Sequence, residues 1–285
     1  MAKTYNELYA ALRRRLLDAG IEACALEARL LTAHAAGMPQ EKLLQELQSS
    51  ASPEVEGRLG ALTARRLAGE PLAYITGRWA FYGLELTVTS GVLIPRSDTE
   101  ALVDKALELA GAFETAPRVL DLCTGSGCIG CALGVQLNGS SLVLADVSPQ
   151  ALALAEKNAA DCGLGARALC QKLDVLSPPP AELGSFDMIV SNPPYIRKEE
   201  LSGLDASVRD FEPRMALDGG SDGLDFYRAI LRHWTGLLRP GGWLLLEIGE
   251  DQARDVTALL AQAGLTDLGV ARDAADHDRV VWGRI

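Results

Sequence analysis

RVLDLCTGSG (residues 118–127) combines an apolar run typical of a buried strand with a glycine-rich turn directly after it. Glycine suits such a turn because the chain must bend sharply and approach a ligand without a Cβ in the way. In open parallel sheets a turn of this kind lies at the carboxyl edge, where ligands bind. The stretch therefore predicts an α/β fold with a ligand site beside Gly125 and Gly127.

Strands and helices are expected to alternate from this stretch to the end of the chain. Helical patterns fit residues 150–162 and 225–238, between the apolar segments expected to form strands. The alternation predicts a doubly wound, mostly parallel sheet in a domain of residues 96–285. The expected strands are residues 118–122, 142–146, 168–171, 187–191, 243–248 and 280–283.

The residues before this domain have helical patterns. Thr4 and Glu7 fit a capping box that starts the first helix. Ser52 and Pro53 fit an N-cap and first-turn pair that starts another helix, which ends before Gly69. Residues 1–75 are therefore predicted to form a small helical bundle, joined to the sheet domain by a β-hairpin over residues 76–95. Apolar positions at helical spacing are Leu8, Leu12 and Leu16 in the first helix and Leu26, Leu30 and Leu31 in the second.

The net charge of −11 at pH 7 limits the classes of partner. An acidic chain repels nucleic-acid phosphates unless it gathers a basic face, and the short arginine clusters at residues 13–15 and 65–66 are typical of solvated helix surface. The longest apolar runs, such as residues 243–246, are too short to cross a membrane. The first ten residues lack the pattern of a signal peptide. We expect a cytoplasmic protein with no membrane partner and no direct nucleic-acid partner.

The chain has six cysteines, two of which form a CxxC motif. Such a motif, here Cys128 and Cys131, occurs in redox pairs and in zinc sites. No second CxxC follows, and the three histidines, at positions 34, 233 and 277, lie far from it in the sequence. We therefore expect buried apolar thiols and no bound metal.

Two cofactors compete for the glycine-rich turn. Gly125, Gly127 and Gly130 match the GxGxxG fingerprint of dinucleotide-binding proteins, which is a weak signal by itself. Here, however, the acidic residue Asp121 stands at the end of the strand before the glycines. A carboxylate there would repel a pyrophosphate but attract the ammonium group of S-adenosylmethionine, directly or through water. We therefore expect S-adenosylmethionine as cofactor and S-adenosylhomocysteine as product.

Two further acidic residues follow the next two strands. Asp146 can accept two hydrogen bonds from ribose hydroxyls, a role that fits either cofactor. Asp174 either reaches the edge of the adenine or caps a turn. The residues expected to bind the cofactor are Asp121, Cys123, Thr124, Gly125, Ser126, Gly127, Asp146, Asp174, Val175 and Asn192.

Asn192-Pro193-Pro194-Tyr195 is the most informative stretch for the reaction. The nitrogen of an amide or aromatic amine is a poor nucleophile, and no side chain is basic enough to deprotonate it. The Asn192 side-chain carbonyl and the Pro193 backbone carbonyl could instead accept its N–H groups and aim its lone pair at the methyl group, while Pro194 fixes the peptide geometry. Tyr195 would offer a flat face to a planar substrate. We expect Asn192, Pro193 and Tyr195 to be catalytic, and these three with Pro194 to bind the substrate.

With these motifs, the chain resembles the release-factor glutamine methyltransferases, the protein-(glutamine-N5) methyltransferases of the PrmC/HemK family. The resemblance implies a seven-stranded, Rossmann-like methyltransferase sheet and methylation of the glutamine in the Gly-Gly-Gln loop of peptide-chain release factors. It also implies that the helical N-terminal domain grips the release factor. Besides the Asp121 loop and residues 192–195, the matching motifs are Glu70-Pro71 and residues 74–77, 92–96, 99–100, 212–213, 216–217, 222–224 and 240–242.

The chain departs from the family pattern at several positions. Cys123 stands where the loop usually has glycine, and Ser97-Asp98 stand where Pro-Glu is usual. Residues 1–69 match the family only in helical character. Arg96 and Glu100 either shape the rim of the active site or form an ordinary ion pair at the start of a helix.

Two other functions fit parts of the sequence. Asn-Pro-Pro-Tyr also fits adenine-N6 methyltransferases acting on DNA or RNA, which need a basic groove that the net charge of −11 disfavours. A nicotinamide-dependent oxidoreductase would leave residues 192–195 without a role. The leading prediction is a monomeric enzyme that methylates the side-chain amide nitrogen of a glutamine in release factors.

Overall fold

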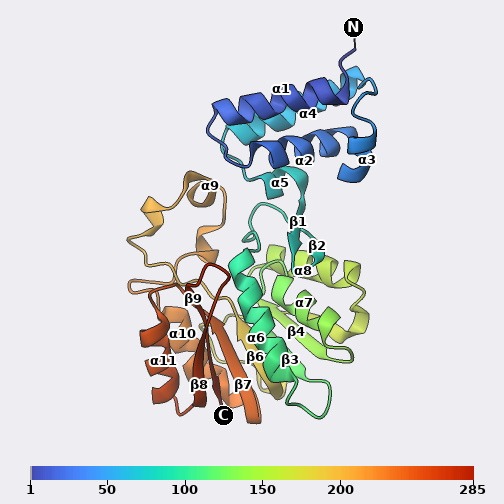
Figure 1. Ribbon diagram of the computed structural model, residues 1–285. Helices are drawn as coiled ribbons and strands as arrows, with labels where there is room; N and C mark the ends of the chain where they lie inside the picture. Colours follow the sequence, from blue (N-terminus) through green and yellow to red (C-terminus); the bar gives the residue numbers. More distant parts are fainter. Residues whose placement is uncertain (1) are drawn as a thin grey trace. The chain divides into compact units, whose positions relative to one another are not determined.

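The computed structural model of the protein describes residues 2–285, which form two compact units (Figure 1). The first unit contains the residues up to Gly77 together with Ala206–Phe211. The second contains Arg78–Asp205 and Glu212–Ile285. The domain boundaries predicted from the sequence lie at residues 75 and 95. They do not account for Ala206–Phe211, a later segment that belongs to the first unit.

Helices form the first unit. The capping box at the start of the first helix is confirmed: Thr4 Oγ1 accepts from the Glu7 N–H at 3.2 Å, and Glu7 Oε2 accepts from the Thr4 N–H at 2.8 Å. Ser52 and Pro53 start a later helix as its N-cap and first residue, as predicted. The helices are α1 (Tyr5–Asp18), α2 (Cys24–Ala36), α3 (Gln40–Gln45), α4 (Pro53–Leu67), α5 (Leu72–Thr76) and, from the later segment, α9 (Ala206–Arg209).

The apolar faces of these helices form the core of the first unit. Leu8, Leu12 and Leu16 of α1 are all buried there, together with Leu31 of α2. Leu26 is 46% exposed, so the helical spacing that placed it with Leu30 and Leu31 overstates the width of the buried face.

The two arginine clusters of this unit differ in their surroundings. Residues 13–15 are exposed, as expected. Arg66 instead makes a bidentate pair with Glu27, with Nε–Oε2 at 2.6 Å and Nη2–Oε1 at 3.2 Å, and this pair ties α4 to α2. Arg65 pairs with Glu70. The prediction of a solvated surface was therefore wrong for Arg66, because its partner lies 39 positions away and cannot be seen in a local charge pattern.

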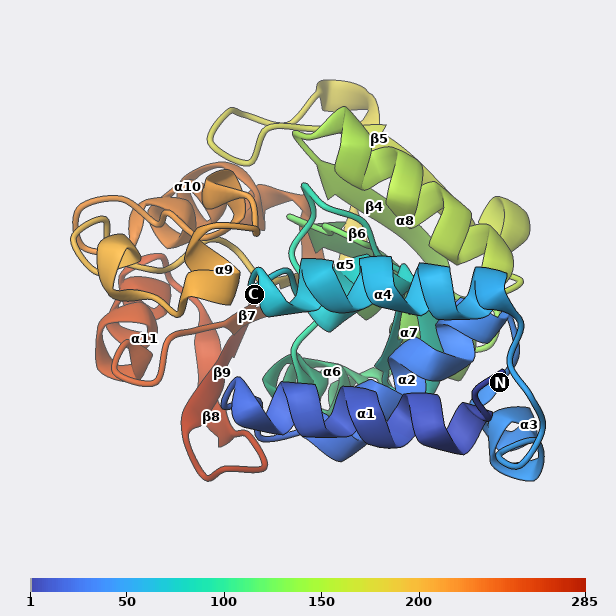
Figure 2. The same cartoon turned by 90° about the horizontal axis from the view of Figure 1, so that it is seen from above.

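The second unit is built on a seven-stranded sheet with the order β5-β4-β3-β6-β7-β9-β8. The first five strands of this order pair in parallel, while β9 runs antiparallel to both β7 and β8. Seen from above, β4 and β5 lie at one end of the sheet and β8 and β9 at the other (Figure 2). The predicted doubly wound, mostly parallel sheet is confirmed. Its strands are β3 (Arg118–Leu122), β4 (Ser141–Asp146), β5 (Ala168–Lys172), β6 (Phe186–Ser191), β7 (Leu238–Glu247), β8 (Thr266–Arg272) and β9 (Asp278–Arg284).

Helices cover both faces of this sheet. Val119 and Leu120, neighbours on β3, pack into different cores because successive strand residues point to opposite faces. Cys128 and Cys131 are buried in the core that contains Val119, as expected for apolar thiols. Among residues 2–285, no helix is long and apolar enough to cross a membrane. One face carries α6 (Glu100–Ala110), α7 (Cys128–Gln136) and α8 (Pro149–Asp161), and the other α10 (Asp225–His233) and α11 (Ala253–Gln262).

The sequence patterns missed strand β8 and misplaced the start of β7. Strand β8 pairs only with β9, and its residues are exposed or half-buried. An edge strand of this kind lacks the continuous apolar run that reveals a strand buried on both faces. Strand β7 begins at Leu238, within the segment expected to be helical, because α10 ends at His233.

A two-stranded hairpin precedes the sheet, as predicted. It consists of β1 (Arg78–Phe81) and β2 (Leu84–Thr87), which pair antiparallel. The buried Asn158 of α8 fastens its end: Asn158 Oδ1 accepts from the Thr87 N–H at 2.8 Å, and Asn158 Nδ2 donates to the carbonyls of Thr87 (2.9 Å) and Ser126 (2.8 Å). One side chain thus joins the hairpin to the glycine-rich turn.

Gly130 sets the distance between α7 and the sheet. An added Cβ would lie 2.1 Å from Leu144 Cδ2 and 3.1 Å from Asp121 Oδ2. The Gly130 N–H also donates to Asp121 Oδ2 at 3.0 Å. The last glycine of the GxGxxG pattern is therefore needed for close packing of helix against strand.

We expect Gly130→Ala to lower the free energy of unfolding by about 1–3 kcal/mol, the usual cost of forcing extra volume into a packed core. Chemical denaturation followed by circular dichroism measures this change. Val135→Ala, at a position of α7 that is 40% exposed, serves as the control and should change stability by less than about 0.5 kcal/mol. Equal stability of the Gly130→Ala and wild-type proteins would contradict the packing role.

Candidate active site

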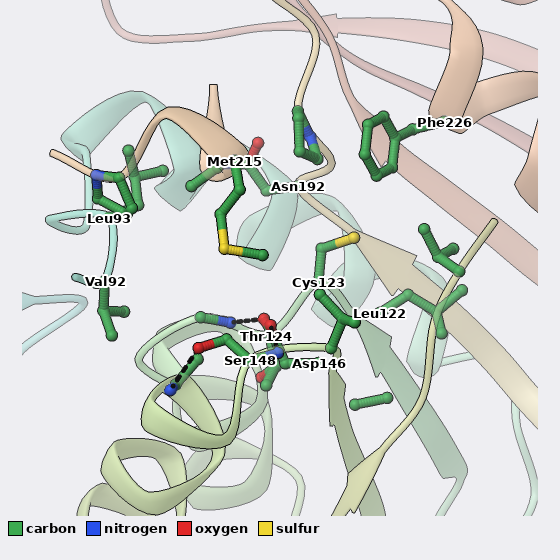
Figure 3. Close-up of a pocket in the computed structure, with 18 of the residues that line it drawn as sticks. Val92, Leu93, Leu122, Cys123, Thr124, Asp146, Ser148, Asn192, Met215 and Phe226 are labelled. Atoms are coloured by element: carbon green, nitrogen blue, oxygen red, sulfur yellow. Dashed lines mark hydrogen bonds between the residues drawn. The ribbon is translucent and has the colours of Figure 1, made fainter. Parts of the chain in front are cut away.

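A cavity of about 590 Å³ lies in the second unit where β3, β4 and β6 end (Figure 3). This is the carboxyl edge of the parallel strands, where the sequence places the ligand site. Its walls come from segments within residues 91–99, 122–129, 145–151, 173–176, 192–194 and 213–226. The predicted cofactor residues among them are Cys123, Thr124, Gly125, Ser126, Asp146, Asp174, Val175 and Asn192.

The glycine-rich turn takes left-handed backbone conformations at three positions. Gly125 has φ 56° and Gly127 has φ 80°. Cys123 has φ 57°, a conformation that favours glycine, so this cysteine is strained where the resembled family usually has glycine. Burial raises the pKa of the Cys123 thiol, which is therefore neutral and a weak nucleophile.

Asp121 lies beneath this turn and does not line the cavity. Its Oδ2 accepts from the Thr124 hydroxyl at 2.6 Å and from the Gly130 N–H at 3.0 Å. Its Oδ1 is buried with no hydrogen-bond partner among the described residues. Burial is the main reason that the pKa of Asp121 rises to about 7, and the nearby carboxylate of Asp146 adds to the rise. The carboxyl group therefore braces the turn from below.

Asp146 lines the cavity at the end of β4. Its Oδ2 accepts from the Gly125 N–H and its Oδ1 from the Ser148 N–H, both at 2.9 Å. Burial raises the pKa of this carboxyl group. Each oxygen has a second lone pair, so the group can still accept hydrogen bonds from a ligand's hydroxyls.

Asp174 and Val175 line the cavity beyond β5. Asp174 Oδ1 accepts from the Leu176 N–H at 2.9 Å and Oδ2 from the Ser177 hydroxyl at 3.2 Å, so this residue does cap a turn. Val175 is buried, and its carbonyl accepts from Trp234 Nε1 at 2.9 Å. The turn-capping role of Asp174 leaves its carboxylate beside the cavity.

Asn192 lies across the cavity from Asp146 (Figure 3). Its side-chain nitrogen Nδ2 donates to Thr99 Oγ1 at 3.2 Å. This contact leaves Oδ1 as the amide atom that can accept from a ligand. Pro194 also lines the cavity, whereas Pro193 is buried outside the lining.

Tyr195 points away from this cavity. Its hydroxyl donates to Glu247 Oε1 at 3.4 Å. Its side chain lines a second cavity of about 370 Å³, which Gln252 and Arg279 also line. Burial raises the pKa of the Tyr195 hydroxyl. The structure therefore separates Tyr195 from Asn192, although only two residues lie between them.

Arg96 and Glu100 have different partners. Arg96 Nη2 pairs with Glu212 Oε1, and Glu212 Oε2 accepts from the Ile94 N–H at 3.1 Å. Glu100 Oε1 accepts from the Tyr82 N–H at 2.7 Å. Since Arg96 lines the cavity, it shapes the rim. The buried Glu212 contacts both Ile94 and Arg96, so it joins residues 94–96 to the lining segment that begins at residue 213.

Apolar side chains complete the cavity wall. Val92 and Leu93 lie on one side of it, and Met215 extends toward its middle (Figure 3). Phe226 lies on the same side as Asn192. Met215 is 54% exposed, so part of this apolar surface is open to solvent.

Two protein-family models match parts of this chain. Residues 7–77 match the PrmC N-terminal domain, and residues 99–207 match the Methyltransferase small domain.

Proteins named release factor glutamine methyltransferase match almost the whole chain. The one from Geobacter sulfurreducens is 44% identical over 275 residues, which are 96% of this chain and 94% of that protein. The one from Moorella thermoacetica is 43% identical over 267 residues, which are 93% of each protein. Identity at this level over this length shows a common family.

Solved structures support the fold of most of the chain. A methyltransferase from Pyrococcus furiosus is similar with a TM-score of 0.51 at 15% identity, over 79% of this chain and 98% of that chain. The hMettl16 catalytic domain has a TM-score of 0.57 at 18% identity, over 78% and 81%. At such identities the similarity concerns the fold alone. By its full-length relatives, the chain belongs to the release factor glutamine methyltransferase family.

Proposed function

We propose that this protein transfers the methyl group of S-adenosylmethionine to the side-chain amide nitrogen of the glutamine in the Gly-Gly-Gln loop of peptide-chain release factors. Family membership supports the proposal, and one contact carries it chemically. Asn192 lines the cavity with its amide nitrogen bound to Thr99, so its oxygen is the atom left to accept a substrate N–H. A glutamine amide presents two such N–H groups.

The residues of the cavity fit S-adenosylmethionine. A volume of about 590 Å³ is within the usual range for small-molecule sites. Asp146 is placed to accept from the ribose hydroxyls, and Val92 and Leu122 offer apolar surface to an adenine ring. The Oδ1 atom of Asp121 has no hydrogen-bond partner among the described residues, and a ligand ammonium above the turn would favour the ionised form of this carboxyl group. Bound there, the cofactor would supply an electrophilic methyl group.

The protein's own contribution would be to orient the substrate. Asn192 Oδ1 and the Pro193 backbone carbonyl would accept the two N–H groups of the glutamine amide and aim its lone pair into the cavity. Pro194 fixes φ in this segment and has no N–H to compete for these acceptors. The flat face expected from Tyr195 is not available to this site, because its side chain lines the second cavity and its hydroxyl donates to Glu247. The rate gain would come from positioning and fixed dipoles, with the proton leaving as the new bond forms.

Label transfer tests the proposed function. The protein would be incubated with methyl-labelled S-adenosylmethionine and, separately, a release factor, the same factor with Gly-Gly-Gln changed to Gly-Gly-Ala, and DNA and RNA oligonucleotides. We expect label on the unmodified release factor alone. Label on an oligonucleotide alone would instead support the adenine-N6 alternative.

We expect Asn192→Ala to lower turnover by about 100-fold or more, since removing one fixed polar group from a transition-state site typically costs this much. Affinity for S-adenosylmethionine, measured by calorimetry, should stay within about threefold because Asn192 acts on the substrate. Asn138→Ala removes the same amide from an exposed loop and serves as the matched control. Full activity of the Asn192→Ala protein would refute the proposed mechanism.

Asp146→Asn should weaken S-adenosylmethionine binding by about 10- to 100-fold, the usual loss of a charge-assisted hydrogen bond. Calorimetry gives the dissociation constant. Asp161→Asn, at the exposed end of α8, is the control with the same change of charge. An unchanged dissociation constant in the Asp146→Asn protein would exclude the ribose role.

Asp121 should make the stability of the unliganded protein depend on pH. Its pKa is about 7 in the folded protein, against about 3.9 in an unfolded chain. The folded state therefore keeps a proton that the unfolded state releases, so this carboxyl group costs stability increasingly as the pH rises from about 4 to 7. Asp121→Asn removes this titration, and its stability relative to wild type should rise between about pH 4 and pH 7.

Denaturation at several pH values measures this difference. The pKa of Glu247 is also raised to about 7, but that group is present in both proteins and cancels in the comparison. A difference that stays constant with pH would contradict the assignment to Asp121.

A further inference from the structure

A buried polar cluster lies directly behind Asn192, at the ends of β6 and β7. Thr99, at the start of α6, is 1% exposed, and Glu247, the last residue of β7, is also 1% exposed. The function proposed above uses Thr99 only as the partner of the Asn192 amide nitrogen and gives the Glu247 carboxylate no role. Burying a carboxylate is costly unless charged or polar groups compensate for its lost hydration.

The contacts of this cluster form a chain that ends at Asn192. Asn192 Nδ2 donates to Thr99 Oγ1 at 3.2 Å. The Thr99 hydroxyl faces the Glu247 carboxylate and lowers the pKa of that group, as a nearby hydrogen-bond donor would. Tyr195 donates to Glu247 Oε1 at 3.4 Å. Two residues of the Asn192–Tyr195 segment are thus connected to the same buried carboxylate.

Several groups from different elements face Glu247. Burial raises the pKa of its carboxyl group to about 7, and the hydroxyls of Thr99 and Tyr195 and the charge of Arg279 on β9 oppose this rise. Asp98 raises it further. Arg279 makes its direct contacts elsewhere, with Nε at 3.0 Å from Asp273 Oδ2 and Nη1 at 3.0 Å from the Ile248 carbonyl. Glu247 therefore has no ion pair to account for its place, and its Oε2 has no hydrogen-bond partner among the described residues.

We propose that Thr99 and Glu247 are positioning residues that fix the orientation of the Asn192 amide, so that its oxygen and not its nitrogen faces the substrate. This inference rests on the proposed function, because the orientation matters only if Asn192 accepts a substrate N–H.

The reason lies in the donors and acceptors that each group offers. A threonine hydroxyl both donates and accepts, so by itself it could hold either end of an amide. An ionised carboxylate can only accept hydrogen bonds. The Thr99 hydroxyl must therefore donate its hydrogen bond to Glu247, and toward Asn192 it can only accept. The donor in Asn192 is Nδ2, and Oδ1 must therefore face the cavity. With Glu247 protonated this constraint is lost, and the amide can turn to present its NH₂ group to a substrate that also offers N–H.

Steady-state kinetics with S-adenosylmethionine and a release factor test the inference. Thr99→Val keeps the shape but removes the hydroxyl, and we expect kcat to fall about 10- to 100-fold, as for other small misplacements of a catalytic group. KM for the release factor and the dissociation constant of S-adenosylmethionine should change by less than about threefold. Thr99→Ser, which restores the hydroxyl, should recover most of kcat. Equal losses in the Val and Ser variants, or no loss in either, would overturn the inference.

The pH profile separates positioning from packing. Wild-type kcat should rise with pH through about 7 as Glu247 ionises, and this step should be absent in Glu247→Gln. The same step in the Glu247→Gln protein would exclude Glu247 as its source and contradict the inference.

A readout without turnover covers the case in which the proposed substrate is wrong. The side-chain NH₂ signals of Asn192, assigned by their absence in Asn192→Ala, would be followed by nuclear magnetic resonance from about pH 6 to pH 8. They should shift in the wild type and stay constant in Thr99→Val. Unshifted wild-type signals would refute the inference, whereas shifted signals without label on the release factor would refute only the proposed function.

Discussion

The hydrogen bond from Asn192 Nδ2 to Thr99 Oγ1 determines which end of an amide faces the cavity. The two residues are 93 positions apart, and the fold brings them together because Asn192 follows β6 while Thr99 begins the helix that packs on one face of the same sheet. The cofactor loop after β3 lies beside Asn192 because β3 and β6 are neighbours in the strand order. The topology of a parallel sheet thus puts the loop that would bind a cofactor and the loop that would bind a substrate at one edge.

The buried carboxyl groups at this edge of the sheet lower the stability of the unliganded protein. Asp121 and Glu247 are fully buried carboxyl groups, and burial raises the pKa of each to about 7. Asp146, close to Asp121, also has a raised pKa. A cluster of carboxyl groups that resists ionisation suits a site for a cationic ligand, since a bound positive charge would stabilise the ionised forms.

Local sequence patterns were sufficient to predict the helices, strands and turns that neighbouring residues determine. The capping box at Thr4, the strand that ends at Asp146 and the glycine-rich turn all depend on neighbouring residues, and the structure has them where they were expected. Strand β8 was missed because an exposed edge strand carries no apolar run.

Contacts between distant residues could not be predicted in the same way. Nothing near Tyr195 in the sequence indicates that its hydroxyl meets Glu247, 52 residues later. Thr99 was singled out only as part of a family motif, and Glu247 had no signal beyond being an acidic residue at the end of an apolar strand. The sequence also could not show how deeply the Asp121 side chain is buried. It lies under the turn and outside the cavity lining, so the direct ligand contact suggested for it is not available.

A crystal structure of the protein with S-adenosylhomocysteine and a Gly-Gly-Gln peptide would test the central claim most directly. We predict that the ligand's ribose contacts Asp146, and that Asn192 Oδ1 accepts from the glutamine amide on the side facing the sulfur. An Asn192 side chain that presents Nδ2 to the glutamine, or a ligand bound outside this cavity, would contradict it.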